Sequence, residues 1–354
     1  MTHQAASFFA GCQEAFAAAR RRRPGPSRDY RLAGHGVTLE FAGESLPALI
    51  LPALALEAAE VPLPGLRVAL WDFDDSGIAA PAPPWRWSAF TGGAGGRIMM
   101  PGFDDPRFRA VLGADYRLLW MLARETQQAI VWSRGAPRLP AWEHLHPLRL
   151  LLHAWLRDRG LALLHAGSVG TAAGGALIAG SGGAGKSTTV LAALAGGLTS
   201  AGDDYVALES QPAPRVHALY GTMRLFADHA ACFPGLLPAN DHEDSVEGRA
   251  KLAAYVGRHR PAALVGSLPL LAVVAPRVSP GARPALEPLG ADEALAALAP
   301  STLQQLSPDE GVLVAMTALC RRLPCRRLVL GRDLDAVPHL LAGLIAEAES
   351  TVHA

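Results

Sequence analysis

Residues 176–190 read Ala-Leu-Ile-Ala-Gly-Ser-Gly-Gly-Ala-Gly-Lys-Ser-Thr-Thr-Val, and this stretch decides the fold. Its centre, residues 180–187, fits the phosphate-binding loop G-x-x-x-x-G-K-[ST]. An apolar run of strand type precedes the loop, and residues 188–195 have the composition of a helix that ends at Gly196-Gly197. Strand, loop and helix in this order predict an α/β domain that binds a nucleotide.

Each position of the loop has a chemical task. Backbone N–H groups turn inward around phosphate oxygens, the lysine reaches the outer phosphates, and the hydroxyl of the next residue binds magnesium. The N-terminus of the following helix adds partial positive charge. We therefore expect ATP and Mg²⁺ as ligands, with Ser187 on the metal. The predicted nucleotide-binding residues are Gly180, Ser181, Gly182, Gly183, Ala184, Gly185, Lys186, Ser187 and Thr188.

Two adjacent carboxylates, Asp203 and Asp204, stand between this helix and another apolar stretch. On its own, Gly-Asp-Asp is good turn chemistry, and such a turn would be solvated. Beside a phosphate loop, one carboxylate can hold magnesium or its water shell while the other accepts a proton from an attacking hydroxyl. The neighbouring loop favours this second interpretation.

A histidine lies upstream of the loop, in residues 163–170, which read Leu-Leu-His-Ala-Gly-Ser-Val-Gly. If residues 161–169 pair with residues 175–179 as a β-hairpin, His165 lies near the phosphate end of the sheet. There its imidazole could bind a second metal or polarise a phosphate oxygen. A lone histidine in an apolar run could equally be a hydrogen-bonded core residue, so both interpretations stay open.

Taken together, His165-Ala-Gly-Ser, a strand, the phosphate loop, a helix and Ala-Gly-Asp-Asp-Tyr resemble the HPr serine kinase/phosphorylase group. That group shares its nucleotide fold with ATP-dependent phosphoenolpyruvate carboxykinases. The resemblance covers roughly residues 140–340. Within the group, this region is most similar to HPr-kinase-related proteins of bacterial gene clusters, some of which phosphorylate a serine in a precursor peptide. It implies a kinase domain with a mixed sheet, Asp203 as catalytic base, Asp204 on the metal side, and His165 as a catalytic or metal-adjacent residue.

One departure from the family pattern bears on function. Enzymes that act on HPr carry a glutamate in a Glu-Ile-Arg-Gly segment after the Asp pair, whereas residues 219–225 here read Leu-Tyr-Gly-Thr-Met-Arg-Leu. The missing carboxylate argues against a second metal site, against reverse phosphorolysis and against HPr as the acceptor. HPr kinases assemble as hexamers, so the resemblance makes a homo-oligomer one expectation, although nothing in the N-terminal half identifies such an interface.

Cations are needed opposite the charge that develops in phosphoryl transfer. Arg224 and Lys251 follow the Asp pair, and we expect them to contact phosphate or substrate; either could instead be a solvated surface charge. The acidic residues 241–247 are predicted to form a mobile loop that either covers the acceptor or faces solvent.

Length and composition suggest a two-domain protein of 354 residues. We predict an N-terminal helix and basic linker over residues 1–27, an α+β accessory domain over residues 28–140, and the nucleotide-binding domain over residues 141–354. Within the accessory domain, the spacing of residues 116–126 predicts an amphipathic helix.

Charge and cysteine usage narrow the class of partner and the compartment. A formal net charge of zero argues against nucleic acid or an anionic membrane as partner. Four scattered cysteines without zinc spacing are typical of reduced thiols in the cytoplasm. The N-terminal apolar stretch precedes its arginines, which is the reverse of a secretory signal.

The leading hypothesis is an ATP-dependent kinase that phosphorylates a serine-type hydroxyl of a peptide or small protein. Two alternatives stay open. The same site could take a small-molecule hydroxyl, or ATP could be a ligand that switches the N-terminal domain for a partner without catalysis.

Overall fold

The computed structural model describes residues 2–82, 98–104, 106–113, 117–230, 232–233, 242–246, 249–306 and 309–352. They form two compact units: unit 1 is Met1–Pro52 with Leu56–Trp155, and unit 2 is Ala53–Ala55 with Leu156–Ala354. The division falls inside helix α5 (Arg149–Arg157), some fifteen residues after the boundary expected at residue 140. No helix in the described part of the chain is long and apolar enough to cross a membrane.

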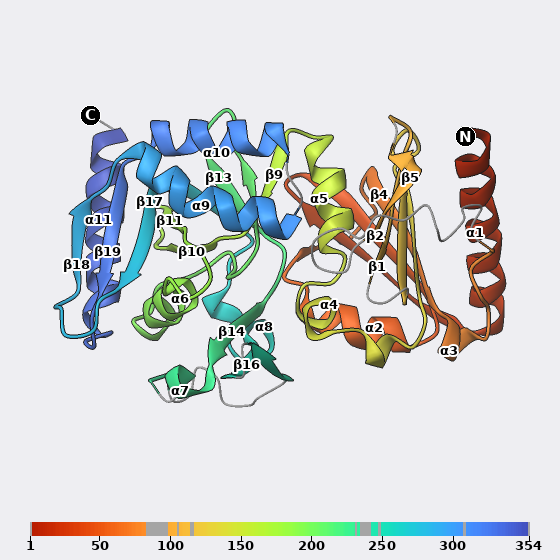
Figure 1. The fold of residues 1–354 in the computed structure, drawn as a ribbon, viewed down its shortest axis with the longest axis horizontal. Helices are drawn as coiled ribbons and strands as arrows, with labels where there is room; N and C mark the ends of the chain where they lie inside the picture. The colour runs from red at the N-terminus through yellow and green to blue at the C-terminus, as the bar shows by residue number, and fades with distance from the viewer. Residues whose placement is uncertain are drawn as a thin grey trace. The chain divides into compact units, whose positions relative to one another are not determined.

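Unit 1 is a mixed sheet with the long helix α1 on one face (Figure 1). The strand order is β3-β1-β2-β4-β8-β7-β6-β5, and β2, β4 and β8 run parallel. Aromatic side chains fix α1 to the sheet, because the rings of Phe9 and Phe108 lie 5.8 Å apart and those of Phe16 and Trp71 lie 6.1 Å apart. The strands are β1 Pro24–Leu32, β2 His35–Ala42, β3 Glu57–Ala58, β4 Gly65–Asp72, β5 Ile98–Asp104, β6 Phe108–Gly113, β7 Leu118–Ala123 and β8 Gln128–Ser133. The helices are α1 Thr2–Arg22, α2 Ser45–Ile50, η1 Leu51–Ala53, α3 Phe73–Ser76, η3 Ala136–Arg138, α4 Ala141–Leu145 and α5.

The prediction of an amphipathic helix over residues 116–126 is wrong. Residues 118–123 form β7, which pairs antiparallel with β6 and β8, and a turn follows at residues 124–127. Leu119 and Met121 pack on the α1 face, whereas Leu118 and Trp120 line a cavity on the other face. Both faces of the sheet are covered, so an unbroken apolar run suits a strand here. Tyr116 lies outside the described residues.

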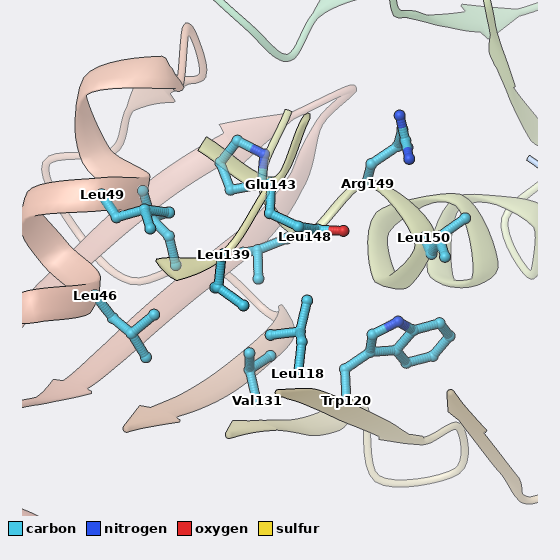
Figure 2. A pocket seen from close by; sticks show the side chains of 12 residues that line it. Leu46, Leu49, Leu118, Trp120, Val131, Leu139, Glu143, Leu148, Arg149 and Leu150 are labelled. Atoms are coloured by element: carbon cyan, nitrogen blue, oxygen red, sulfur yellow. The ribbon is translucent and has the colours of Figure 1, made fainter. Parts of the chain in front are cut away.

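That cavity is apolar and small. Figure 2 shows leucine side chains and Trp120 around it, with Glu143 and Arg149 at its margin. Its volume of about 30 Å³ accommodates a water molecule or two at most, so it is no candidate for a substrate site.

Unit 2 is a sheet between two layers of helices. α9 and α10 cover one face, and α6 and α11 cover the other (Figure 1). The central strand β17 pairs with β11, β13 and β19, and its side chains alternate between the layers: Val273 faces α9 and α10, while Val274 faces α6 and α11. The strands are β9 Leu161–Leu164, β10 Gly167–Gly170, β11 Gly175–Ile178, β12 Val206–Glu209, β13 Arg215–Ala218, β17 Ser267–Val278, β18 Ala285–Pro288 and β19 Cys325–Leu330. The helices are α6 Lys186–Ala195, α7 Ala227–Ala230, α8 Val256–His259, η4 Pro261–Ala263, α9 Ala291–Leu306, α10 Glu310–Arg322 and α11 Ala336–Val352.

The hairpin predicted before the loop is present only in part. β10 pairs antiparallel with β11, as expected, but residues 161–164 form a separate strand, β9, that pairs with β12. The chain changes neighbours at His165 and Ala166, which belong to neither strand. This break places His165 beside the end of β12, where the Asp pair lies.

A second, three-stranded sheet has the order β14-β16-β15, with β14 Thr222–Phe226, β15 His242–Val246 and β16 Arg249–Tyr255. The prediction of a mobile loop over residues 241–247 is therefore wrong for residues 242–246, because the backbone of these residues pairs with β16. Asp241 and Glu247 lie outside the described residues.

Candidate phosphate-binding site

The phosphate loop has the strand and the helix that the sequence predicted. β11 leads into it, the Ala179 N–H donates to the Val274 carbonyl at 2.8 Å, and α6 begins at Lys186. Gly183 and Gly185 have φ angles of 80° and 102°, in the left-handed region that glycine tolerates. A Cβ atom on Gly185 would also collide with Leu330. Both glycines are therefore required by the path of the backbone.

Lys186 is buried and folded onto its own loop. Its Nζ donates to the carbonyls of Gly180 and Ser181 at 2.8 and 3.2 Å. Burial lowers the pKa of Lys186, the nearby Asp204 and Asp203 oppose that shift, and Lys251 adds to it. The ammonium therefore lies in the combined field of two carboxylates and a second lysine.

Asp203 is 0 % exposed, and neither of its carboxylate oxygens has a hydrogen-bond partner of normal geometry. Burial, followed by the charge of Asp204, raises the pKa of Asp203 to about 7, although the Ser187 hydroxyl and Lys186 act in the opposite direction. The carboxylate fits against β10 because residue 167 is a glycine. Any larger residue there would place its Cβ atom 3.0 Å from Asp203 Oδ1. A buried carboxylate with vacant lone pairs is costly unless something binds it.

Asp204 is held in a strained turn that presents it to the cavity. Its φ is 59°, and the Tyr205 N–H donates to the Asp203 carbonyl at 2.6 Å across it, which makes Asp204 the central residue of a γ-turn. Positive-φ turns of this kind are rare for non-glycine residues and cluster at functional sites. The carboxylate lies beside His165, with 3.8 Å between Asp204 Oδ1 and His165 Nε2.

His165 lies at the cavity rather than inside the core. Its ring packs against Tyr205, with 5.2 Å between the ring centroids, and its backbone N–H donates to Thr302 Oγ1 at 3.1 Å. The side chain is 12 % exposed. Of the two interpretations that the sequence left open, the position beside Asp204 favours a role at the site.

Helix α9 supports the site, and the sequence did not identify this role. Ser301 Oγ donates to the Gly180 carbonyl at 3.4 Å, Thr302 accepts from His165, and Gln305 accepts from the Tyr205 hydroxyl at 3.5 Å. Pro300 precedes the two hydroxyls inside the helix. A proline followed by two hydroxyl residues in a helix is a signal that could have drawn attention here, because helix interiors disfavour all three residue types.

A cavity of about 170 Å³ adjoins the loop. The loop, His165 and Asp204 line one part of it, and Arg224, Phe226 and Lys251 of the three-stranded sheet line another. Phe226 pairs directly with Lys251 and Arg224 with Ala253, so these side chains share one face of that sheet. The structure thus brings most of the residues that the sequence singled out to one cavity, whereas Gly180, Ala184 and Asp203 do not line it. His229 of α7 lines the cavity too and was not predicted.

Magnesium requires a separate test of fit. In the described ranges, no group of three or more His, Cys, Asp or Glu side chains could hold a metal ion. Magnesium at a nucleotide needs fewer, because phosphate oxygens and waters complete its octahedral shell. The Ser187 hydroxyl and the buried Asp203 carboxylate beside it offer hard oxygen ligands, so the residues present fit a nucleotide-bound magnesium ion.

Comparisons with known proteins give little to add to this geometry. No protein family matches the chain, and no curated protein matches its sequence. Among solved structures, the Hpr(Ser) kinase/phosphatase from Coxiella burnetii is similar at 12% identity and a TM-score of 0.29, over 54% of this chain and 99% of that one. A likeness of this strength carries no functional argument.

Proposed function

We propose that unit 2 is a magnesium-dependent phosphotransferase that moves the γ-phosphate of ATP to a serine-type hydroxyl of a peptide or small protein. The observation that carries this proposal is that one cavity joins a phosphate loop, cations from two elements, and a carboxylate held in a strained turn. Each of these parts corresponds to one requirement of phosphoryl transfer.

The charges of the cavity suit a polyanion. Among the side chains that the structure describes, Lys186, Arg224 and Lys251 line it, and Asp204 is the one lining carboxylate. Backbone N–H groups of the loop and the N-terminus of α6 add partial positive charge. A triphosphate would neutralise this excess, and its outer phosphates would draw Lys186 away from the loop carbonyls that it now contacts.

The two aspartates differ in surroundings, and we assign their roles in the reverse of the order that the resemblance implied. Asp204 lines the cavity and can reach an acceptor hydroxyl, so we assign it as the base. Asp203 is fully buried close to Ser187, which suits a ligand on the metal side. A magnesium ion bound there would neutralise charge on the phosphate oxygens during transfer.

The proposed transfer exchanges one phosphorus–oxygen bond for another. The acceptor oxygen forms a bond to the γ-phosphorus while the bond from that phosphorus to the β–γ bridging oxygen breaks. The hydroxyl proton moves to the Asp204 carboxylate, and ADP leaves with the bridging oxygen. His165, 3.8 Å from Asp204, orients that carboxylate and can take the proton on to solvent. The choice of a serine in a peptide rests on the sequence resemblance alone.

Radiolabel transfer from γ-labelled ATP to host peptide, protein and metabolite fractions tests the proposal. Lys186→Ala should lower transfer by roughly a thousandfold, because it removes the cation at the transferring phosphate. Asp204→Asn should abolish turnover and keep most of the affinity for ATP. The matched controls Arg321→Ala and Asp333→Asn change exposed charges and should behave as the parent protein.

The outcomes separate the candidates. Label in a peptide or protein fraction supports the proposal, and label only in metabolites indicates a small-molecule kinase. ATP binding that Asp204→Asn preserves, with no transfer by the parent protein to any fraction, indicates a non-catalytic nucleotide switch. Transfer by Lys186→Ala at the parent rate would dispose of the site assignment.

A further inference from the structure

The use of lysine in this chain is unusual and localised. Of its 32 lysines and arginines, only Lys186 and Lys251 are lysines. Both line the same cavity, although 65 residues separate them in sequence and they belong to different elements, α6 and β16. Lysine offers a compact point charge with three donors, which arginine does not reproduce. Both lysines of the chain therefore line this one cavity.

The side chain of Lys251 has a defined setting. Phe226 lies directly opposite it in the β14–β16 pair, and its Nζ lies 5.6 Å from the centroid of the Phe226 ring. That distance is within the range of a cation–π contact, so the aromatic ring stabilises the position of the lysine side chain at the cavity wall. Among the described residues, no ion pair or hydrogen bond involves its ammonium.

The two ammonium groups repel each other in the absence of a ligand. Both side chains line the same cavity, Lys186 from α6 and Lys251 from β16. Arg224 lies on the same face of the three-stranded sheet, so a third cation faces the same space. Holding like charges together costs free energy that an anion between them would recover.

We propose that Lys251 is a second phosphate-binding lysine, whose ammonium contacts the transferring phosphate of the bound nucleotide from the three-stranded sheet while Lys186 contacts it from the loop. This assignment rests on the proposed function. It makes Lys251 a catalytic residue, because a cation on the transferring group stabilises the charge that its oxygens carry in the transition state. The three-stranded sheet thereby becomes part of the nucleotide site rather than a surface attachment.

Lysine acylation tests the assignment directly, because each of the two lysines lies in its own peptide. The full-length protein is treated with a limiting N-hydroxysuccinimide ester, with and without the magnesium complex of the non-hydrolysable analogue AMP-PNP. Acylation at each lysine is then quantified by mass spectrometry, with an added lysine peptide as the reference. We expect the nucleotide to slow acylation of both lysines by about fivefold or more, since each ammonium would be held by phosphate.

The outcomes distinguish this inference from the proposed function. Protection of Lys186 with unchanged reactivity of Lys251 would overturn the assignment and leave the phosphate loop intact. Protection of neither, in a protein that also fails to bind the analogue, would remove the proposed function together with it. Protection of both supports the assignment.

Substitution adds a readout that a packing role would not give. Lys251→Met should lower phosphate transfer by about a hundredfold, and Lys251→Arg, which keeps the charge and the contact with Phe226, should recover only part of that loss. The matched control is Arg258→Met, because Arg258 lies over Tyr255 at 4.8 Å, also beside an aromatic ring, and does not line the cavity. Equal transfer by Lys251→Met and the parent protein would contradict the assignment.

Discussion

Asp203 is a residue whose burial the proposed metal site would explain and packing alone does not. It is fully buried, and burial together with the charge of Asp204 raises its pKa to about 7. Between about pH 4 and pH 7 the folded protein retains a proton that the unfolded chain has lost, so this carboxyl lowers stability as the pH rises through that window. Above pH 7 the full cost remains.

Asp203→Asn should therefore stabilise the metal-free protein. We expect the free energy of unfolding at pH 8 to rise by about 2 to 4 kcal/mol, and the gain at pH 5 to be smaller, because the wild-type side chain is protonated there in the folded state. Urea denaturation in EDTA at both pH values measures the difference, with the exposed Asp333→Asn as control. A variant less stable than the parent at pH 8 would show that the carboxylate has a structural partner.

Asp204 and Gly167 show at the same scale what the sequence could supply. The Asp pair was identified beside the loop, but its division of labour depends on a γ-turn at Asp204 and on a glycine 36 residues upstream of Asp203 that leaves room for its carboxylate. The γ-turn is closed by a local hydrogen bond, whereas the glycine acts through a contact between distant segments. No local pattern encodes them, which is why the roles that we propose differ from the order that the resemblance implied.

At the scale of elements, α9 fixes two parts of the site at once. Ser301 contacts a loop carbonyl and Thr302 accepts the backbone N–H of His165, so one helix sets the distance between the phosphate loop and the histidine. The Tyr205 hydroxyl, bonded to Gln305, extends this support to the ring that packs on His165.

Thr302→Val keeps the volume of the side chain and leaves the His165 N–H without its acceptor, at a cost of about 1 to 3 kcal/mol. We expect kcat to fall about tenfold while the affinity for ATP changes little, because the displaced group is the histidine rather than the loop. Thr302→Ser should restore kcat, since it retains the hydroxyl. Steady-state kinetics of the three proteins decide, and a loss of ATP affinity with unchanged kcat would place the effect in the loop instead.

Elements also show where periodicity is a sufficient guide. The strand and the helix around the loop follow from local apolar patterns and breakers, and the structure confirms both as β11 and α6. β7 does not, because a run of six apolar residues satisfies helix and strand alike until its neighbours β6 and β8 are known. The β15 strand was missed for a related reason: its pairing with β16, and not the composition of its acidic residues, makes it a strand.

At the scale of the whole molecule, the chain does not divide cleanly at one linker. Residues 53–55 belong to unit 2, where the Ala55 N–H donates to the Leu219 carbonyl at 2.9 Å and Leu54 forms a bridge with Tyr220. This segment thus pairs with residues 219 and 220, which immediately precede β14. Arg224 of that strand lines the cavity. The excursion could not be read from the sequence, because a three-residue bridge has neither periodicity nor composition to mark it.

Magnesium-dependent binding of ATP to the intact protein is the measurement closest to the central claim. Calorimetric titration with AMP-PNP should give one site per chain with a Kd between about 1 μM and 1 mM in magnesium, weaker by at least about tenfold in EDTA and in Lys186→Met. Binding that neither the metal nor Lys186 affects, or no binding at all, would contradict the claim that this loop and its cavity form a nucleotide site.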